Sequence, residues 1–255
     1  ADDLIFIYTG GTTGLPKGVM WTHGALWEAL GGGAPVRGDP VPDSIASLQE
    51  NIRAGLGRNR LLVFPPLMHG AGFMMAINTL AMGGAVVTMP GVHFDPHVAL
   101  DEIARHRPTV AVVVGDAFAR PLLNALDERG RSAAIASLQM MVSSGTLWSP
   151  DVKAGLLRHN PAMMLLDVFG SSEGLGLGAA VTVGENAAAP TRFIHDGRTR
   201  VITDDGRDVA PGSEEVGRIA RTGPLPLGYF KDPEKTARTY VELDGCRYVL
   251  PGDYA

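Results

Sequence analysis

The sequence predicts an α/β fold in which helices cover mostly parallel sheets, with a small antiparallel β module near the C-terminus. Short, continuously apolar runs alternate with helical segments between residues 60 and 170. Strands buried on both faces of a parallel sheet have this composition. Toward the C-terminus the runs become short and β-prone, with turn signals such as Asp205-Gly206. We therefore expect an α/β part over residues 1–183 and a β-rich part over residues 184–255.

We predict the individual helices and strands from the periodicity of apolar residues and from the glycines and prolines that mark turns between them. The glycine-rich and proline-rich stretch 31–43 is expected to be a surface excursion. One strand is expected on each side of the glycine-rich loop at residues 8–18, and the alternating α/β region comes later in the chain. Strands are expected at residues 3–8, 18–23, 60–66, 85–89, 108–115, 138–145, 162–170, 216–223 and 245–250, a hairpin with Asp205-Gly206 at its turn at residues 199–209, and helices at residues 22–30, 43–55, 70–82, 95–107, 116–130 and 149–160.

Helix starts are marked by capping residues. Asp95 before Pro96, and Ser149 before Pro150, have the pattern of an N-cap followed by proline at the first helical position. Thr22 is a candidate cap for the first helix, and Ser47 with Glu50 has the spacing of a capping box. Pro121 is expected to interrupt or start the helix that contains it.

Composition limits the classes of function. The chain has 255 residues, 45% of them hydrophobic, and a formal charge of −5, so no basic field indicates a nucleic acid or an anionic membrane. Its one cysteine, Cys246, excludes an internal disulfide framework and suits a reducing, cytoplasmic setting. The most apolar region, residues 72–89, contains Asn78 and the pair Gly83-Gly84, so it lacks the run of about 20 apolar residues that a membrane span requires.

The loop YTGGTTGLPKG, residues 8–18, combines glycines, three threonines and Lys17. Glycines permit close backbone approach, and the hydroxyl and N–H donors with one cation suit a polyphosphate. It is not a Walker loop, because Lys17 follows Pro16 and precedes Gly18. A plain turn between two strands explains the glycines, but it explains the threonines and the lysine poorly.

A second candidate site is VFGSSEG, residues 168–174, at the end of a buried strand. There Phe169 could stack on a base and Glu173 could ligate Mg²⁺. The alternative is the capped start of a helix, with Ser171 or Ser172 as the cap and Glu173 in the first turn. From the residues alone, both readings stay open.

Three weaker candidates also follow strands or turns. Gly145-Thr146 in SSGTLWSP could present backbone groups to a base, although an ordinary strand–helix loop is the simpler reading. His69 in PLMHG could contact a carboxylate or phosphate, or pack at a helix start. Asp253 in PGD could bind ribose hydroxyls, or be a solvated turn residue. The other histidines are dispersed, and nothing supports a zinc site.

The order of these motifs resembles the AMP-forming acyl-CoA synthetase family, which belongs to the adenylate-forming superfamily with luciferases and peptide-synthetase adenylation domains. The resemblance covers essentially the whole chain, and finer details, including the stretch 31–43, are similar to actinobacterial members. The motifs are YTGGTTGLPKG, PLMHG, SSGTLWSP, VFGSSEG, GYFKDPEKT and PGD.

The resemblance implies a two-step reaction. A carboxylate attacks the α-phosphate of magnesium ATP to form an acyl-adenylate and pyrophosphate, and a thiol, here coenzyme A, then displaces AMP. The implied residues of the chemistry are Thr12, Lys17, His69 and Glu173, with Glu173 holding Mg²⁺, Lys17 balancing pyrophosphate charge and His69 at the mouth of the acyl pocket. The implied nucleotide contacts are Thr9, Gly10, Gly11, Thr12, Thr13, Gly14, Lys17, Gly145, Thr146, Leu147, Phe169, Gly170, Ser171, Ser172 and Asp253.

The chain departs from the family pattern in two ways. Gly10 stands where the family usually has serine, and Phe169 and Ser172 stand where tyrosine and threonine are usual. The family's N-terminal portion, and its mobile C-terminal domain with a catalytic lysine, have no counterpart here. The expectation is therefore a piece of a longer enzyme, inactive or nearly so by itself.

Three other functions stay open. An adenylation domain that loads a carrier protein shares these motifs, and the isolated chain could be a non-catalytic nucleotide-binding module. A nucleoside triphosphatase with an unusual phosphate loop is disfavoured by Gly18 after Lys17. The expected partners are ATP, a carboxylic acid and coenzyme A, with no nucleic acid and no membrane span, and the sequence does not predict an oligomeric state.

Overall fold

The computed structural model describes residues 3–9, 16–34, 39–56, 58–130, 132–146, 148–186 and 189–255. The chain divides into two compact units. One, here called the β-rich unit, consists of Ala1–Ala29, Phe169–Gly178 and Ile194–Ala255, and the other, the α/β unit, of Leu30–Val168 and Ala179–Phe193. Each unit is assembled from separate stretches of chain, so the expected division at residue 183 stays a prediction.

The α/β unit is built on a mostly parallel sheet, as the apolar runs predict. The described strands have the order β4-β3-β5-β6-β7-β8, and the pairs β3–β4, β3–β5, β5–β6 and β6–β7 are parallel. β8 follows β7 directly in the chain and was not expected. The strands are β3 (Arg60–Val63), β4 (Ala85–Thr88), β5 (Val110–Val113), β6 (Met140–Ser144), β7 (Met164–Ser171) and β8 (Gly174–Thr182).

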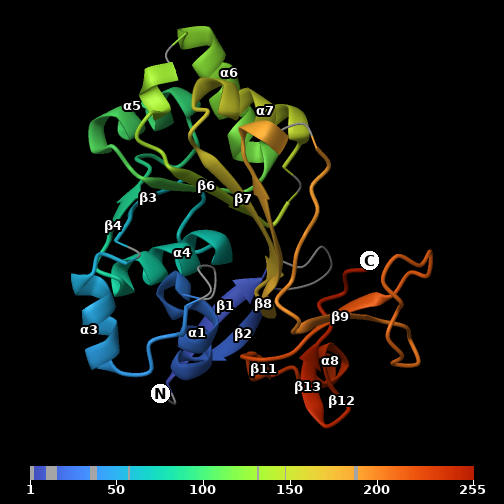
Figure 1. Cartoon of the computed structure of the whole chain (residues 1–255). Coiled ribbons are helices and arrows are strands. Elements are labelled where there is room, and N and C mark those ends of the chain that lie inside the picture. Colours follow the sequence, from blue (N-terminus) through green and yellow to red (C-terminus); the bar gives the residue numbers. More distant parts are fainter. Residues whose placement is uncertain are drawn as a thin grey trace. The chain divides into compact units, whose positions relative to one another are not determined.

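Helices cover both faces of this sheet. α5 (Pro96–His106), α6 (Asp116–Arg129) and α7 (Pro150–His159) lie on one face and α4 (Gly70–Ala81) on the other (Figure 1). Strand side chains alternate between the two layers, so that Leu62 joins the core under α5–α7 whereas Leu61 joins the core with α4. Burial on both faces explains why the strands are continuously apolar.

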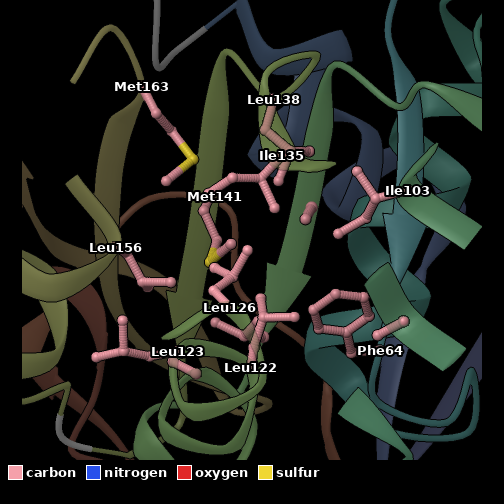
Figure 2. Close-up of a cluster of buried hydrophobic side chains, with 14 of the residues drawn as sticks. Phe64, Ile103, Leu122, Leu123, Leu126, Ile135, Leu138, Met141, Leu156 and Met163 are labelled. Atoms are coloured by element: carbon pink, nitrogen blue, oxygen red, sulfur yellow. The ribbon is translucent and has the colours of Figure 1, made fainter. Parts of the chain in front are cut away.

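The larger core lies between the sheet and helices α5–α7. Figure 2 shows Phe64, Ile103, Leu122 and Met141 in this cluster, contributed by the β3 end, α5, α6 and β6. Ile103, Leu122 and Met141 have no exposed surface. Burying a side chain of this size contributes about 1.5–3 kcal/mol, so this layer is a major source of stability for the α/β unit.

The β-rich unit has two antiparallel sheets. The first has the order β1-β2-β11 and the second β12-β13-β10-β9, with all their recorded pairs antiparallel. Of these, β11, β12 and the helix α8 were not expected. The elements are β1 (Leu4–Thr9), β2 (Lys17–Thr22), β9 (Thr199–Ile202), β10 (Arg218–Arg221), β11 (Gly228–Tyr229), β12 (Tyr240–Leu243), β13 (Cys246–Val249) and α8 (Pro233–Thr239).

The chain after β9 forms the expected turn at Asp205-Gly206. The main partner of β9 is β10, and Asp208 beyond the turn forms an isolated bridge with Ile202.

The remaining described elements are helices and short helical turns outside the sheets. They are α1 (His23–Leu30), α3 (Ile45–Arg53), η1 (Gly31–Gly33), η2 (Ser132–Ile135) and η3 (Gly184–Asn186). Part of the stretch 31–43 lies outside the described residues.

The capping predictions are confirmed at Thr22 and Asp95 and are corrected at the capping box of α3 and at Ser149, whose side chain makes no capping bond. Thr22 and Asp95 accept hydrogen bonds from backbone N–H groups of the helices that follow them. The capping box of α3 is formed by Ser44 with Ser47, not by Ser47 with Glu50, because the helix starts at Ile45 and Ser47 occupies its third position. Pro121 lies inside α6 without interrupting it.

Within the described ranges, every helix is too short or too polar to reach across a lipid bilayer.

Candidate functional site

The glycine-rich loop connects two paired strands, as expected. Thr9 ends β1 and lies opposite Lys17, the first residue of antiparallel β2. The strand pair continues to Leu4 and Thr22, so both ends of the loop are anchored in a regular ladder. The predicted phosphate contacts Gly10, Gly11, Thr12, Thr13 and Gly14 lie outside the described residues.

Lys17 is paired in the structure, whereas the sequence suggested a lone cation. Its Nζ forms an ion pair with the Asp232 carboxylate, and the two side chains are 35% and 28% exposed. Asp232 also caps α8, because it accepts the N–H of Lys235 at 3.0 Å. The hydrogen bond from Lys17 is the main cause that holds the pKa of Asp232 below its usual range. Asp232 was missed because nothing local in GYFKDPEKT indicates its distant partner.

The motif VFGSSEG is a strand–turn–strand, which makes the helix-start reading wrong. β7 ends at Ser171, β8 begins at Gly174, and Ser172-Glu173 forms the turn between them. The Glu173 N–H donates to Ser171 Oγ at 3.2 Å, which closes the turn locally. A side chain at Gly174 would place its Cβ 2.6 Å from Val249 Cγ1, so the tight contact with β13 requires glycine there.

Aromatic donors surround this turn in the β-rich unit. The Tyr229 hydroxyl donates to Glu173 Oε1 at 2.8 Å, and the Tyr240 hydroxyl donates to the Glu173 carbonyl at 3.3 Å. Trp21 Nε1–H donates to the Ser172 carbonyl at 2.9 Å. Burial and then the Glu173 charge raise the pKa of Tyr229, so its phenol stays protonated and acts as a donor.

The donor set at Glu173 fits a magnesium ion. Tyr229 occupies Oε1, and no hydrogen bond to Oε2 is recorded in the described part of the chain. The same part of the chain holds no cluster of three or more His, Cys, Asp or Glu side chains suited to a metal. A lone carboxylate suits Mg²⁺, which proteins commonly bind through one or two carboxylates together with substrate phosphates.

The loop between β6 and α7 carries the predicted base contacts of the α/β unit. Gly145 has φ +94°, a conformation that favours glycine, and Thr146 is exposed. Leu147 lies outside the described residues. The strand–helix loop is confirmed, and its role in base binding stays a prediction.

Asp116, which the sequence analysis missed, anchors the end of this loop. Its carboxylate accepts the Ser149 N–H at 2.9 Å and also the Ser149 hydroxyl. Burial favours a higher pKa for Asp116, but the bonds from Ser149 and Arg120 outweigh it and lower the pKa. Ser149 therefore occupies the cap position of α7 without capping it through its own side chain.

Two further candidates are exposed. His69 stands at the cap position of α4, where its carbonyl accepts the Phe73 N–H at 2.9 Å and its side chain faces solvent. Asp253 is exposed, but its carbonyl accepts the Ile219 N–H at 2.9 Å, so the backbone is tied to β10. Their roles toward substrate and ribose stay predictions.

A buried ion pair lies close in sequence to the VFGSSEG motif. Lys153 Nζ of α7 is 2.6 Å from Asp167 Oδ2 of β7 and donates to Thr191 Oγ1 at 2.6 Å. The two charged side chains are 2% and 9% exposed. Burial raises the pKa of Asp167, and the Lys153 ammonium opposes that rise. The sequence places Asp167 in a buried strand, because apolar residues surround it, and does not predict its ion pair.

Comparison with known proteins identifies the class. The sequence matches the model of the AMP-binding enzyme family over residues 1–230, and the chain belongs to that family. This confirms the resemblance drawn from the motifs.

Among individual relatives, the chain is 41% identical over 263 residues to the 3-oxocholest-4-en-26-oate–CoA ligase of Rhodococcus rhodochrous, covering all of this chain and 46% of that protein. It is 38% identical over 259 residues to a medium/long-chain-fatty-acid–CoA/3-oxocholest-4-en-26-oate–CoA ligase of Mycolicibacterium smegmatis, again covering all of this chain and 46% of the relative. The chain thus spans about half the length of the curated relatives it matches, and the expected likeness to actinobacterial members is confirmed.

Solved structures confirm the fold class. The nonribosomal peptide synthetase FmoA3 matches 98% of this chain and 25% of its own, with a TM-score of 0.77 and 22% identity. The amide bond synthetase McbA of Marinactinospora thermotolerans matches 98% of this chain and 45% of its own, with a TM-score of 0.72 and 25% identity.

Proposed function

We propose that the full-length protein uses ATP to convert an apolar carboxylic acid into an acyl-adenylate and then transfers the acyl group to coenzyme A. The observation that carries this proposal is the Ser172-Glu173 turn between β7 and β8 in a chain of the AMP-binding family, where one carboxylate oxygen of Glu173 accepts from Tyr229 and the other has no hydrogen bond within the described residues. The proposed reaction belongs to a protein of the relatives' length, of which this chain supplies about half.

In the first step, a substrate carboxylate oxygen bonds to the α-phosphorus of ATP and the α–β bridging oxygen leaves with pyrophosphate. Lys17 balances the growing negative charge of the leaving group, and Thr9, Thr12 and Thr13 donate to the phosphates. Ser172 contacts the α-phosphate. Glu173 would hold Mg²⁺, which supplies charge neutralisation on the phosphate oxygens when it is bound. Donors and a cation aimed at the charge that develops on the phosphates stabilise the transition state.

In the second step, the thiol of coenzyme A loses its proton to solvent, its sulfur bonds to the acyl carbon, and AMP leaves with the electrons of the broken C–O bond. The nucleoside contacts that we assign, following the family resemblance, are Phe169, Gly170, Ser171, Gly145, Thr146 and Leu147, with Asp253 at the ribose. We assign His69 to the mouth of the acyl pocket, near the reacting carboxylate, as the family resemblance implies. The protein supplies no covalent nucleophile.

The names of the relatives support an apolar acid, since they include medium-chain and long-chain fatty acids and a steroid acid. The apolar residues between Gly70 and Gly84 also suit an apolar acid, and within them α4 carries the buried side chains Met74 and Ala76, which serve equally as core. Coenzyme A is favoured as the acceptor because the curated relatives are named CoA ligases. The use of ATP and coenzyme A, with the single cysteine Cys246, suits a cytoplasmic enzyme.

The test is ATP–pyrophosphate exchange on the full-length protein with a panel of acids: fatty acids from short to long chains, aromatic acids and a 3-oxo steroid acid. We expect exchange that depends on an added apolar acid, and acyl-CoA as the product detected by mass. Exchange without thioester formation, unless a phosphopantetheine carrier protein is added, would favour the carrier-loading alternative. Acid-independent release of phosphate would instead indicate a hydrolase and contradict the proposal.

A further inference from the structure

The three aromatic contacts at the Ser172-Glu173 turn are of two kinds. Trp21 and Tyr240 donate to backbone carbonyls, so they hold the path of the chain. Tyr229 donates to the carboxylate itself, at 2.8 Å, and therefore acts on the side-chain conformation of Glu173. A glutamate side chain has several rotamers, and fixing one of them removes an entropic cost from any later binding event.

The position of Tyr229 is itself determined by its surroundings. Tyr229 pairs with Val19 in the β2–β11 ladder. On either side of it, the Leu227 N–H donates to the Met20 carbonyl and the Phe230 N–H donates to the Gly18 carbonyl, both at 2.8 Å. The Tyr229 N–H donates to Thr236 Oγ1 at 2.9 Å. The strand that carries Tyr229 is thus bonded on one edge to β2 and at its end to α8.

The ring of Tyr229 is equally confined. The residue is 4% exposed, and the Lys235 ammonium lies 4.6 Å from the ring centroid. The Tyr240 ring packs edge-on at a centroid distance of 6.2 Å. A buried ring between these neighbours cannot swing away, so its hydroxyl is presented to Glu173 before any ligand arrives.

We propose that Tyr229 is a positioning residue for the proposed metal carboxylate: it holds Glu173 through Oε1 and thereby leaves Oε2 available for the cation. This inference rests on the proposed function, because it takes Glu173 as the Mg²⁺ ligand. Groups that orient a metal ligand commonly change metal affinity by about 10–100-fold when they are lost. Removing the Tyr229 hydroxyl leaves Glu173 in its place in the turn, so we expect a loss of metal affinity at the lower end of that range.

The chain offers matched variants for the test. Tyr229→Phe removes the hydroxyl at the carboxylate and keeps the buried ring. Tyr240→Phe removes a hydroxyl from the same turn, but one that meets only the backbone carbonyl. Tyr248→Phe removes a hydroxyl bonded to Arg200 Nη1 at 3.3 Å in the other sheet, and it reports on the general cost of losing a tyrosine hydroxyl.

The experiment uses the full-length protein with a non-hydrolysable ATP analogue and Mn²⁺ as a paramagnetic probe of the Mg²⁺ site. Electron paramagnetic resonance gives the dissociation constant of Mn²⁺ from the enzyme–nucleotide complex, and equilibrium dialysis in EDTA gives the affinity for the metal-free analogue. We expect Tyr229→Phe to weaken Mn²⁺ binding about tenfold and to leave the metal-free nucleotide affinity unchanged. Tyr240→Phe and Tyr248→Phe should change Mn²⁺ affinity less than about twofold, since neither touches the carboxylate.

A double-mutant cycle with Glu173→Gln separates positioning from a general structural effect. In the Gln background, Tyr229→Phe should produce no further loss of Mn²⁺ affinity, because there is no carboxylate left to orient. Unchanged Mn²⁺ affinity in Tyr229→Phe, or an equal loss in Tyr240→Phe, would overturn the inference. Failure of the proposed function is seen separately, as a wild-type protein that binds no nucleotide and shows no acid-dependent exchange.

Discussion

The two units use an ion pair in opposite ways. In the α/β unit, Lys153 and Asp167 are almost completely buried, and a third group, Thr191, takes another proton of the ammonium. In the β-rich unit, Lys17 and Asp232 join the start of β2 to the start of α8 while both stay about one-third exposed. Burial raises the pKa of Asp167, whereas the bond from Lys17 lowers the pKa of Asp232.

The difference between the two ion pairs indicates which charged side chain is free to bind a ligand. Breaking a buried pair leaves a charge stranded in a medium that solvates it poorly, so the pair acts as a structural link between α7 and β7. A pair that water already solvates contributes little to stability and exchanges partners at little cost. Lys17 can therefore leave Asp232 for a phosphate, and Lys153 has no comparable freedom.

The largest effect should come from breaking the buried pair. Lys153→Met strands the Asp167 carboxylate and should lower the free energy of unfolding by about 3–5 kcal/mol, measured by urea denaturation. Lys153→Met with Asp167→Leu, which removes both charges, should recover most of that loss. A single variant within about 1 kcal/mol of wild type would show that the buried pair is not the link described here.

Next in size is the loss of the exposed cation. Lys17→Ala should lower the catalytic efficiency of acid-dependent exchange about 10–100-fold, because a charge-assisted bond to phosphate contributes about 1.5–3 kcal/mol. The unfolding midpoint should stay close to that of wild type, in contrast to Lys153→Met. Exchange kinetics equal to wild type would remove Lys17 from the proposed site.

Glu173→Gln should act on the metal rather than on the nucleoside. We expect the Mg²⁺ concentration for half-maximal exchange to rise about tenfold, because the amide lacks the anionic oxygen that Mg²⁺ prefers. Binding of adenosine, which depends on other residues, should change less. A magnesium titration that overlays the wild-type curve would leave Glu173 with only its role in the turn.

The smallest effect should come from the partner of Lys17. Asp232→Asn removes a competing negative charge, and asparagine still caps α8, so binding of ATP should tighten by up to about fivefold with little change in stability. Because Lys17 lowers the pKa of Asp232 below its ordinary value of 3.8, the pair persists above that pH and is lost only as the pH falls through the lowered pKa. The ratio of variant to wild-type affinity should therefore be constant between about pH 6 and pH 9. Weaker ATP binding in the variant would mean that Asp232 orients Lys17 instead of competing for it.

The sequence by itself determined the sheet class, most of the helix starts and the order of the motifs, because these depend on local periodicity and on single capping residues such as Asp95. It also indicated the family, since the residues of each motif are contiguous. It left the conformation at Ser171–Glu173 open for a physical reason: serines and a glutamate after a strand suit the capped start of a helix as well as a tight turn, and the pairing of β7 with β8 around that turn is a tertiary feature.

Only the tertiary structure decided how those motifs are held. Lys17 meets Asp232 across 215 positions, Trp21 meets Ser172 across 151, and Tyr229 meets Glu173 across 56. Such contacts depend on strand register and on which side chains face each other once the sheets have formed, and no local pattern encodes them. The same holds for Lys153 and Asp167, whose pairing exists because α7 packs on β7 and excludes water from both charges.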